Sequence, residues 1–152
     1  MESSARFSDC RNYRYELWRK WEDKPYCMFI GLNPSTADET LNDPTVRRCI
    51  DYAERWGYGA LCMTNIFSYR ATDPKVMMAF GEPIGLDNNR TLKTLASSAG
   101  VVVAAWGKDG SYMNIDKEVI DMIPFLRCLK KNGDGSPAHP LYLKKSLTPI
   151  LL

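Results

Sequence analysis

Three short, almost wholly apolar runs alternate with amphipathic segments along this chain, and this alternation limits its fold. The runs are YCMFIGLN at 26–33, GALCMTNIF at 59–67 and GVVVAAWG at 100–107. Runs of this length without alternating polar residues are typical of strands covered on both faces. Apolar residues recur at helical spacing in the segments 45–56, 87–99 and 112–123. The alternation predicts βαβ units and a parallel sheet.

Shorter patterns complete the predicted fold. Residues 11–21 alternate polar and apolar side chains, which predicts an antiparallel edge strand or half of a hairpin. A short helix is expected after Asp73-Pro74, and FLRCLKK at 125–131 is a candidate fourth strand. We therefore predict a three-layer α/β/α sandwich with a central, mostly parallel four-stranded sheet and an N-terminal antiparallel strand or hairpin. Residues 1–152 are expected to form a single domain whose ends, 1–10 and 146–152, are flexible or peripheral.

Charge and cysteine content narrow the function classes. The chain has 20 basic and 18 acidic side chains, a net charge of +2, so any contact with DNA must be local. Five cysteines without a CxxC pair, beside a single histidine, argue against a zinc site, and we expect neither a metal nor a cofactor. No signal peptide and no apolar run of membrane-spanning length is present, so we expect a cytoplasmic protein without a membrane partner.

Polar segments follow the predicted strands, where ligands bind in open α/β sheets. We expect these segments to meet at one edge of the sheet. The candidate substrate-binding or catalytic residues are Gly31, Leu32, Asn33, Pro34 and Ser35 after the first strand, Asn65, Phe67 and Arg70 after the second, Trp106 and Lys108 after the third, and His139 and Tyr142 after the fourth.

Several of these side chains suit the recognition of a nucleobase. The Asn33 amide can orient a water molecule, and Asp38 can act as a general base if it turns inward. The Asn65 carboxamide offers a donor and an acceptor side by side, which matches the edge of a base. His139 is the only histidine and lies between prolines, so it is a rigid candidate for stabilising developing charge.

Two basic side chains and one aromatic ring suit the rest of a nucleotide. Arg70 and Lys108 are candidates for phosphate contacts, and Trp106 for stacking on a base.

Each candidate also has a purely structural explanation, and both explanations stay open at this point. Asn-Pro-Ser is a common turn, and an Asn at a strand end is often a cap. Arg70 can be a solvated surface charge, Trp106 a core residue and His139 a structural histidine.

Three of the segments resemble motifs of the uracil-DNA glycosylase superfamily. GLNPS at 31–35 is similar to its first motif, MTNIFSYRATDP at 63–74 to its middle segment, and AHPLYL at 138–143 to its His-Pro motif. More closely, the chain resembles a domain-of-unknown-function family common in phages and bacteria. That pattern includes RYELWRKW, FIGLNPSTAD, NDPTVRRC, WGYGAL, TNIFSYRATDP, AWG and HPLYL, over roughly residues 11–143.

The superfamily resemblance implies hydrolysis of an N-glycosidic bond of a modified base in DNA or in a nucleotide. It implies that Asn33 positions water, Asn65 reads the base, and His139 donates a hydrogen bond to a base carbonyl as the bond breaks. The chain departs from the motif at Leu141, where a small hydroxyl residue is usual. This leaves Leu141 or Tyr142 as a candidate wedge into a base stack.

Two other functions stay open. The same pocket could hold a nucleobase or signalling nucleotide without turnover, as a phage protein does when it sequesters a host signal. Alternatively, exposed aromatic residues such as Trp18 and Trp21 could bind and inhibit a host protein, although edge-strand packing also explains them.

Overall fold

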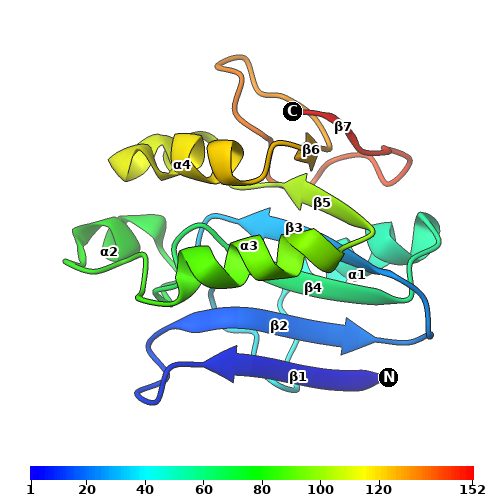
Figure 1. The fold of residues 1–152 in the computed structure, drawn as a ribbon, viewed down its shortest axis with the longest axis horizontal. Helices are drawn as coiled ribbons and strands as arrows, with labels where there is room; N and C mark the ends of the chain where they lie inside the picture. The colour runs from blue at the N-terminus through cyan, green and yellow to red at the C-terminus, as the bar shows by residue number, and fades with distance from the viewer.

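All strands of the protein join one mixed sheet. The structure is a computed structural model that describes residues 1–152. The strands are β1 (Glu2–Phe7), β2 (Arg14–Lys20), β3 (Tyr26–Gly31), β4 (Ala60–Asn65), β5 (Val101–Ala104), β6 (Arg127–Cys128) and β7 (Ile150–Leu151). They lie in the order β1-β2-β4-β3-β5-β6-β7 (Figure 1).

The directions of the strands differ from the sequence prediction. The neighbours β4, β3, β5 and β6 run parallel, whereas the pairings β1–β2, β2–β4 and β6–β7 are antiparallel. The prediction holds only in part: the four parallel strands and the N-terminal antiparallel hairpin are present, but they belong to one mixed sheet of seven strands, which is not mostly parallel. The additional strands carry little sequence signal, since β1 is mostly polar and exposed and β7 has only two residues. Both chain ends, expected to be flexible or peripheral, add these strands at the edges of the sheet.

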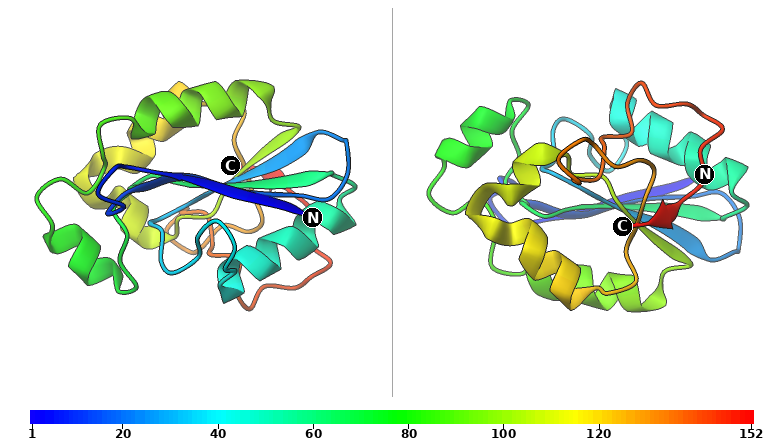
Figure 2. Two further views of the ribbon diagram at one scale, coloured as in Figure 1. Left: turned by 90° about the horizontal axis from the view of Figure 1, so that it is seen from below. Right: turned by 90° about the horizontal axis from the view of Figure 1, so that it is seen from above.

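The apolar runs form the inner strands, and their two faces bury different cores. Met28 and Ile30 of β3 point into a cluster with helices α3 (Asn88–Ser98) and α4 (Ile115–Met122). Cys27 and Phe29 point to the other face, where α1 (Pro44–Arg55) packs. Figure 2 shows α1 and α3 on opposite sides of the sheet. Each inner strand is thus apolar on both faces, as the unbroken runs predicted.

The helices begin close to the predicted places. Helix α1 begins at Pro44 because the Asp43 carboxylate accepts a hydrogen bond from the Val46 N–H at 2.8 Å, and Gly57 with φ of 85° follows its end. The short helix after Asp73 is α2 (Pro74–Ala79). The region predicted as a helix at 112–123 is instead divided between the 3-10 helix η1 (Lys108–Asn114) and α4. The last two residues of η1, Met113 and Asn114, have positive φ and interrupt the helical path just before α4 begins.

The N-terminal hairpin contains an irregularity that redirects one side chain. Arg6 pairs with Glu16 but Phe7 pairs with Arg14, so Tyr15 is an extra residue in β2. Side chains of a regular strand point alternately to its two faces, and Leu17 faces α1. In a regular strand Arg14, three residues before Leu17, would therefore face α3. The extra residue reverses this, because Arg14 donates a hydrogen bond to the Ala37 carbonyl on the α1 side at 3.0 Å.

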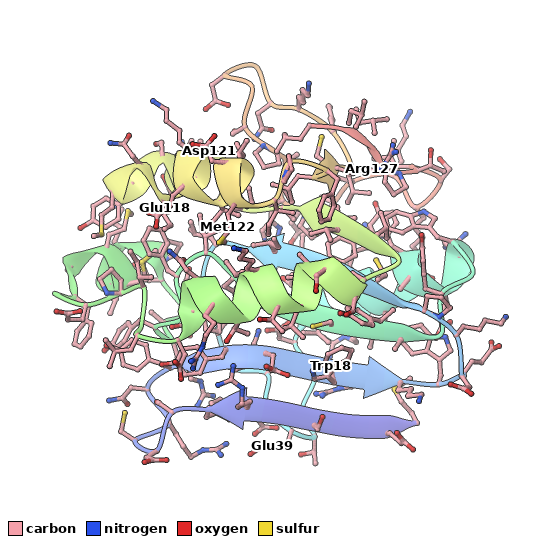
Figure 3. All side chains as sticks on the ribbon, in the orientation of Figure 1. Trp18, Glu39, Glu118, Asp121, Met122 and Arg127 are labelled. Atoms are coloured by element: carbon pink, nitrogen blue, oxygen red, sulfur yellow. The ribbon has the colours of Figure 1, made fainter.

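The tryptophans considered for a surface interaction are used in packing. Trp18 of β2 packs edge-on against Tyr26, with ring centroids 4.8 Å apart, on the sheet face covered by α3 (Figure 3). The Trp21 indole donates to the Tyr58 carbonyl at 3.1 Å. Edge-strand packing therefore explains both side chains. No helix is long and apolar enough to span a bilayer.

Candidate functional site

A cavity of about 410 Å³ lies where β3 and β4 end and α1 begins. Its walls come from segments far apart in the sequence, and its apolar lining includes Phe29, Val46 and Met63. The parallel strands follow the order β4-β3-β5-β6, so the chain crosses from one side of β3 to the other after β4. Ligand sites of open α/β sheets form at such a point, outside the carboxyl ends of the strands. The volume lies within the roughly 300–1,000 Å³ that small-molecule sites occupy.

The cavity brings together many of the residues that the sequence singled out. Asn33 and His139, more than a hundred positions apart, both line it. The other predicted residues in its walls are Gly31, Leu32, Pro34, Ser35 and Asn65, and Leu141 joins them.

The Asn33 side chain uses the N–H end of its amide to connect two segments of the cavity wall. Its Nδ2 donates to the Ala71 carbonyl at 2.7 Å and to the Pro34 carbonyl at 3.3 Å. The bond to Ala71 links the loop after β3 to the segment after β4, and Ala71 and Thr72 of that segment also line the cavity. The donor is thus used by the fold, and the carbonyl oxygen Oδ1 is the end of the amide that can accept a hydrogen bond from a water molecule or ligand.

His139 lies at the solvent-exposed mouth of the cavity with a defined hydrogen-bond pattern. Its Nδ1 accepts from the Leu141 N–H at 3.2 Å, so in the neutral ring Nε2 carries the proton and is the free donor. Partial desolvation lowers the pKa of His139 below its ordinary 6.5, and the negative charge of Asp43 opposes this shift. The imidazole is therefore neutral at pH 7 and acts as an N–H donor.

Asn65 is buried at the end of β4, and its side chain has an unpaired hydrogen-bond donor. The side chain is 3% exposed and its Nδ2 has no hydrogen-bond partner. A Cβ atom at Gly31 would lie 2.8 Å from Asn65 Oδ1, so only glycine allows this close approach. On the other side of the strand, Asn88 Nδ2 donates to the Asn65 carbonyl at 2.7 Å and fixes the backbone. The fold thus holds the Asn65 amide in place while leaving its donor free.

Two charged residues of the cavity were missed by the sequence analysis. Arg14 lines the cavity from β2 and is 3% exposed, with an unpartnered Nε. Burial lowers the pKa of Arg14 to about 10, so it stays charged at neutral pH. Asp43 also lines the cavity while capping α1. Asp43 was missed because the sequence indicates only its structural role as the cap of α1. Arg14 was missed because its direction depends on an extra residue in β2, which the alternation of side chains does not predict.

Asp38, predicted as a general base, serves its own loop instead. Its Oδ1 accepts from the backbone N–H groups of Thr40 at 2.9 Å and Leu41 at 2.8 Å, and these bonds lower the pKa of the carboxyl. Asp38 is not part of the cavity wall. Asp43, five residues further on, is the carboxylate that the cavity contains.

The remaining predicted residues lie elsewhere. Phe67 is fully buried and packs on the Tyr112 ring, and Trp106 is 2% exposed in the core on the α3 side. Trp106 and Lys108 border a different pocket, whereas Ala105 is the residue after β5 that reaches the main cavity. Tyr142 is 94% exposed with φ of 67° and lies outside the wall.

Arg70 occupies an intermediate position. It borders a shallow depression that shares Ser35, Thr36 and Thr72 with the cavity. Its guanidinium donates to the Arg11 carbonyl at 3.3 Å and to the Ser35 carbonyl at 3.5 Å, lies over the Phe7 ring, and forms no ion pair. Its charge lowers the pKa of Arg14, which marks the two cations as neighbours.

The unpaired groups of the cavity define its chemistry. Two of the buried side-chain atoms without partners belong to residues of the cavity wall, Arg14 Nε and Asn65 Nδ2, and both are hydrogen-bond donors. His139 adds a donor at the mouth, and Asp43 is the one carboxylate. No group of three or more His, Cys, Asp or Glu side chains gathers in a way that could hold a metal ion. The free groups of the cavity are thus mostly hydrogen-bond donors, which are complementary to acceptor atoms.

Comparison with known proteins gives a family. The family described as "Protein of unknown function (DUF1643)" matches residues 14–141, which include Arg14 and every other residue that lines the cavity. No curated protein and no solved structure matches the chain. Since the matched residues make up most of the sequence, the chain belongs to the DUF1643 family.

Proposed function

We propose that the cavity binds a nucleobase, in a nucleotide or flipped from DNA, and that the protein hydrolyses its N-glycosidic bond in the manner of a uracil-DNA glycosylase. The observation that carries this proposal is the convergence of Asn33, Asn65 and His139 on one cavity. Helices on both faces of the sheet support the related proposal of a glycosylase-like three-layer α/β/α fold. The GLNPS and HPLYL segments that suggested the resemblance both contribute to the cavity wall.

In the proposed reaction, the base lies between the apolar wall and the Asn65 amide. Nδ2 of Asn65 donates to an acceptor on the base, which satisfies an atom otherwise buried without a partner. His139 donates from Nε2 to a base carbonyl as the glycosidic bond breaks and its electron pair moves onto the base. A neutral imidazole suits this role because it stabilises the developing charge without transferring a proton.

The nucleophile of the proposed reaction is water. Oδ1 of Asn33 accepts one hydrogen bond from it, and the carboxylate of Asp43 accepts the proton as the oxygen attacks the sugar carbon. One oxygen of Asp43 already accepts from the Val46 N–H, which leaves the second oxygen for water. The proton then passes to the departing base, so the products are free base and the sugar.

Release of free base tests the proposal directly. The wild-type chain is incubated with nucleotides and with oligonucleotides that carry modified or mismatched bases, and free bases are measured by mass spectrometry. We expect release to fall about 100-fold or more in His139→Ala, since one preorganised donor contributes about 2.7–4 kcal/mol to such a transition state. Asn33→Ala and Asp43→Asn also reduce release, whereas Lys93→Ala, on the exposed side of α3, does not. No release from any substrate contradicts the proposal.

A second candidate function is binding of a nucleotide or nucleobase without turnover, as in sequestration of a signal. The use of the Asn33 donor by the fold favours it, because this amide then has less freedom to serve a reacting water. Recovery of intact ligand from a tight complex supports this function over hydrolysis.

A further inference from the structure

The cavity contains a buried cation that forms no ion pair with an acidic side chain. Arg14 is 3% exposed, and its one side-chain hydrogen bond runs from Nη1 to the Ala37 carbonyl at 3.0 Å. Its Nε has no partner, and none of the ion pairs of the protein includes it. Arg11, three residues earlier in the chain, is by contrast paired with Glu39 at 2.8 Å. Figure 3 shows Glu39 at the β1 edge of the molecule.

A guanidinium held in this way is costly to the folded protein. Arg14 is charged at neutral pH, because even after burial its pKa stays at about 10. A buried charge without a counter-ion loses its hydration and gains little in return. The extra residue in β2 turns this charge into the cavity, and such irregularities in strands are common beside binding sites because they redirect a side chain. An anionic group on a bound ligand would supply the counter-ion that the Arg14 guanidinium lacks.

The surroundings of Arg14 add further donors and positive potential. One other residue of the cavity wall has a buried atom without a partner, and this atom, Asn65 Nδ2, is also a donor. The first turn of α1, a helix of 12 residues, forms part of the wall and contributes the positive end of its dipole. Asp43 weakens this potential, but one of its oxygens caps α1 and it forms no ion pair with Arg14.

We infer that Arg14 binds an anion, and that the ligand of this cavity carries an oxyanion, a phosphate or a carboxylate, that enters the cavity with it. A guanidinium presents parallel N–H groups that match two oxygens of such a group. The inference rests on the proposed function only in using the same cavity. It deepens that function by naming the substrate class, a free anionic nucleotide or acidic base. In DNA the phosphates stay on the backbone outside, while a flipped base alone enters the pocket.

Binding of matched charged and neutral probes to the wild-type chain tests the inference. Calorimetric titration compares adenosine and uridine 5′-monophosphates with adenosine and uridine, and orotate with uracil. We expect at least one charged probe to bind about tenfold or more tightly than its neutral counterpart, since a hydrogen bond to a charged group contributes about 1.5–3 kcal/mol. The monophosphate pairs report a phosphate, and the orotate pair reports a carboxylate. Equal affinities within every pair overturn the inference.

Variants then assign the effect to Arg14. Arg14→Gln should abolish the advantage of the charged probe, and Arg14→Lys should keep part of it because the charge remains while the planar fork is lost. The matched control is Arg127→Gln, since Arg127 is exposed on β6 and should not change binding (Figure 3). A full advantage in Arg14→Gln overturns the inference, because the anion then binds elsewhere. If Arg14→Gln does not fold, Arg14→Lys decides: an undiminished advantage there also overturns it.

The two proposals can fail separately. Binding is measured without turnover, so tight binding of a charged probe without release of base supports the anion site and contradicts the glycosidase. Release of base from an oligonucleotide, with equal binding of charged and neutral probes, supports the glycosidase and contradicts the anion site.

Discussion

Arg14 and Arg19 lie near opposite ends of β2, and both are buried against the loop that follows β3. Arg19 is 1% exposed and donates to five acceptors: Asn42 Oδ1 at 2.8 Å and the carbonyls of Ser4 at 3.5 Å, Trp18 at 2.8 Å, Asp38 at 2.7 Å and Leu41 at 3.1 Å. Arg14 is 3% exposed and donates from its side chain to one acceptor, the Ala37 carbonyl. Equal burial thus accompanies very different degrees of hydrogen bonding.

This difference in hydrogen bonding distinguishes a structural arginine, Arg19, from an arginine that we propose to bind a ligand, Arg14. Three of the five bonds of Arg19 go to the loop after β3, to the carbonyls of Asp38 and Leu41 and to the Asn42 side chain, and they fix its path. The side chain of Arg19 therefore has its hydrogen-bond partners within the protein. Arg14 borders a cavity and keeps a donor unpaired. In this protein the number of satisfied donors, rather than burial or residue type, distinguishes the two roles.

The largest effect is expected from Arg19→Met. The substitution leaves several loop carbonyls and the Asn42 side chain without their donor, so we expect the free energy of unfolding to fall by about 3–5 kcal/mol. Urea denaturation followed by circular dichroism measures it. A loss smaller than that of Arg14→Met would break the comparison between the two arginines.

An intermediate effect is expected from Gly31→Ala, which tests the other free donor of the cavity. The added Cβ would lie 2.8 Å from Asn65 Oδ1 and must displace this amide from its position. We expect a loss of about 1–3 kcal/mol in the free energy of unfolding, as for overpacking of a core, together with weaker ligand binding. Gly133→Ala is the control, because nothing lies within 4 Å of its added Cβ. Equal stability of the two variants would show that Asn65 is not held against Gly31.

Arg14→Met should change stability least among the substitutions in this comparison. It removes one hydrogen bond but also a buried charge without a counter-ion, so the two contributions nearly cancel. We expect the free energy of unfolding to change by no more than about 1 kcal/mol, measured by urea denaturation in a buffer without phosphate or carboxylate ions. A loss as large as that of Arg19→Met would assign Arg14 a structural role.

The inner part of the fold was predictable because its signals are local. The runs at 26–33, 59–67 and 100–107 became β3, β4 and β5 because apolar side chains on both strand faces require cover on both sides. The outer strands were predictable only in part. Alternation predicted β2, and the strand expected at 125–131 contains β6, although only Arg127 and Cys128 pair there. The two-residue strand β7 has no periodicity to detect, and β1 is held by pairing with β2 rather than by burial.

Residues of the candidate site were predictable where their position along a strand determines whether they reach the cavity. Asn33 follows the end of β3, and Asn65 is the last residue of the neighbouring parallel strand β4, so their meeting at one cavity follows from topology. Trp106 lies elsewhere because strand alternation continues past β5 and turns Ala105, not Trp106, to the cavity. Arg14 could not be found, since its direction depends on an extra residue in β2 that single-sequence alternation cannot detect.

The smallest expected effect concerns His139, the second basic group that Asp43 influences. The charge of Asp43 raises the pKa of both Arg14 and His139, and desolvation outweighs it at His139. Asp43→Asn keeps a side chain that can cap α1 but removes the charge, so we expect the pKa of His139 to fall further below its ordinary 6.5. Because His139 is the only histidine, nuclear magnetic resonance follows its titration without overlap.

The sign of the associated stability change follows from the direction of this shift. The pKa of His139 is lower in the folded protein than in the unfolded chain, so the unfolded chain binds the proton more tightly. The contribution of His139 to stability is therefore present above pH 6.5 and is lost as the pH falls through the lowered folded pKa. The loss is small because the imidazole is partly exposed, and Asp43→Asn should shift it to lower pH. If the pKa of His139 does not change in Asp43→Asn, the Asp43 carboxylate does not influence His139. Its charge would then act on Arg14 only, the buried cation of the cavity.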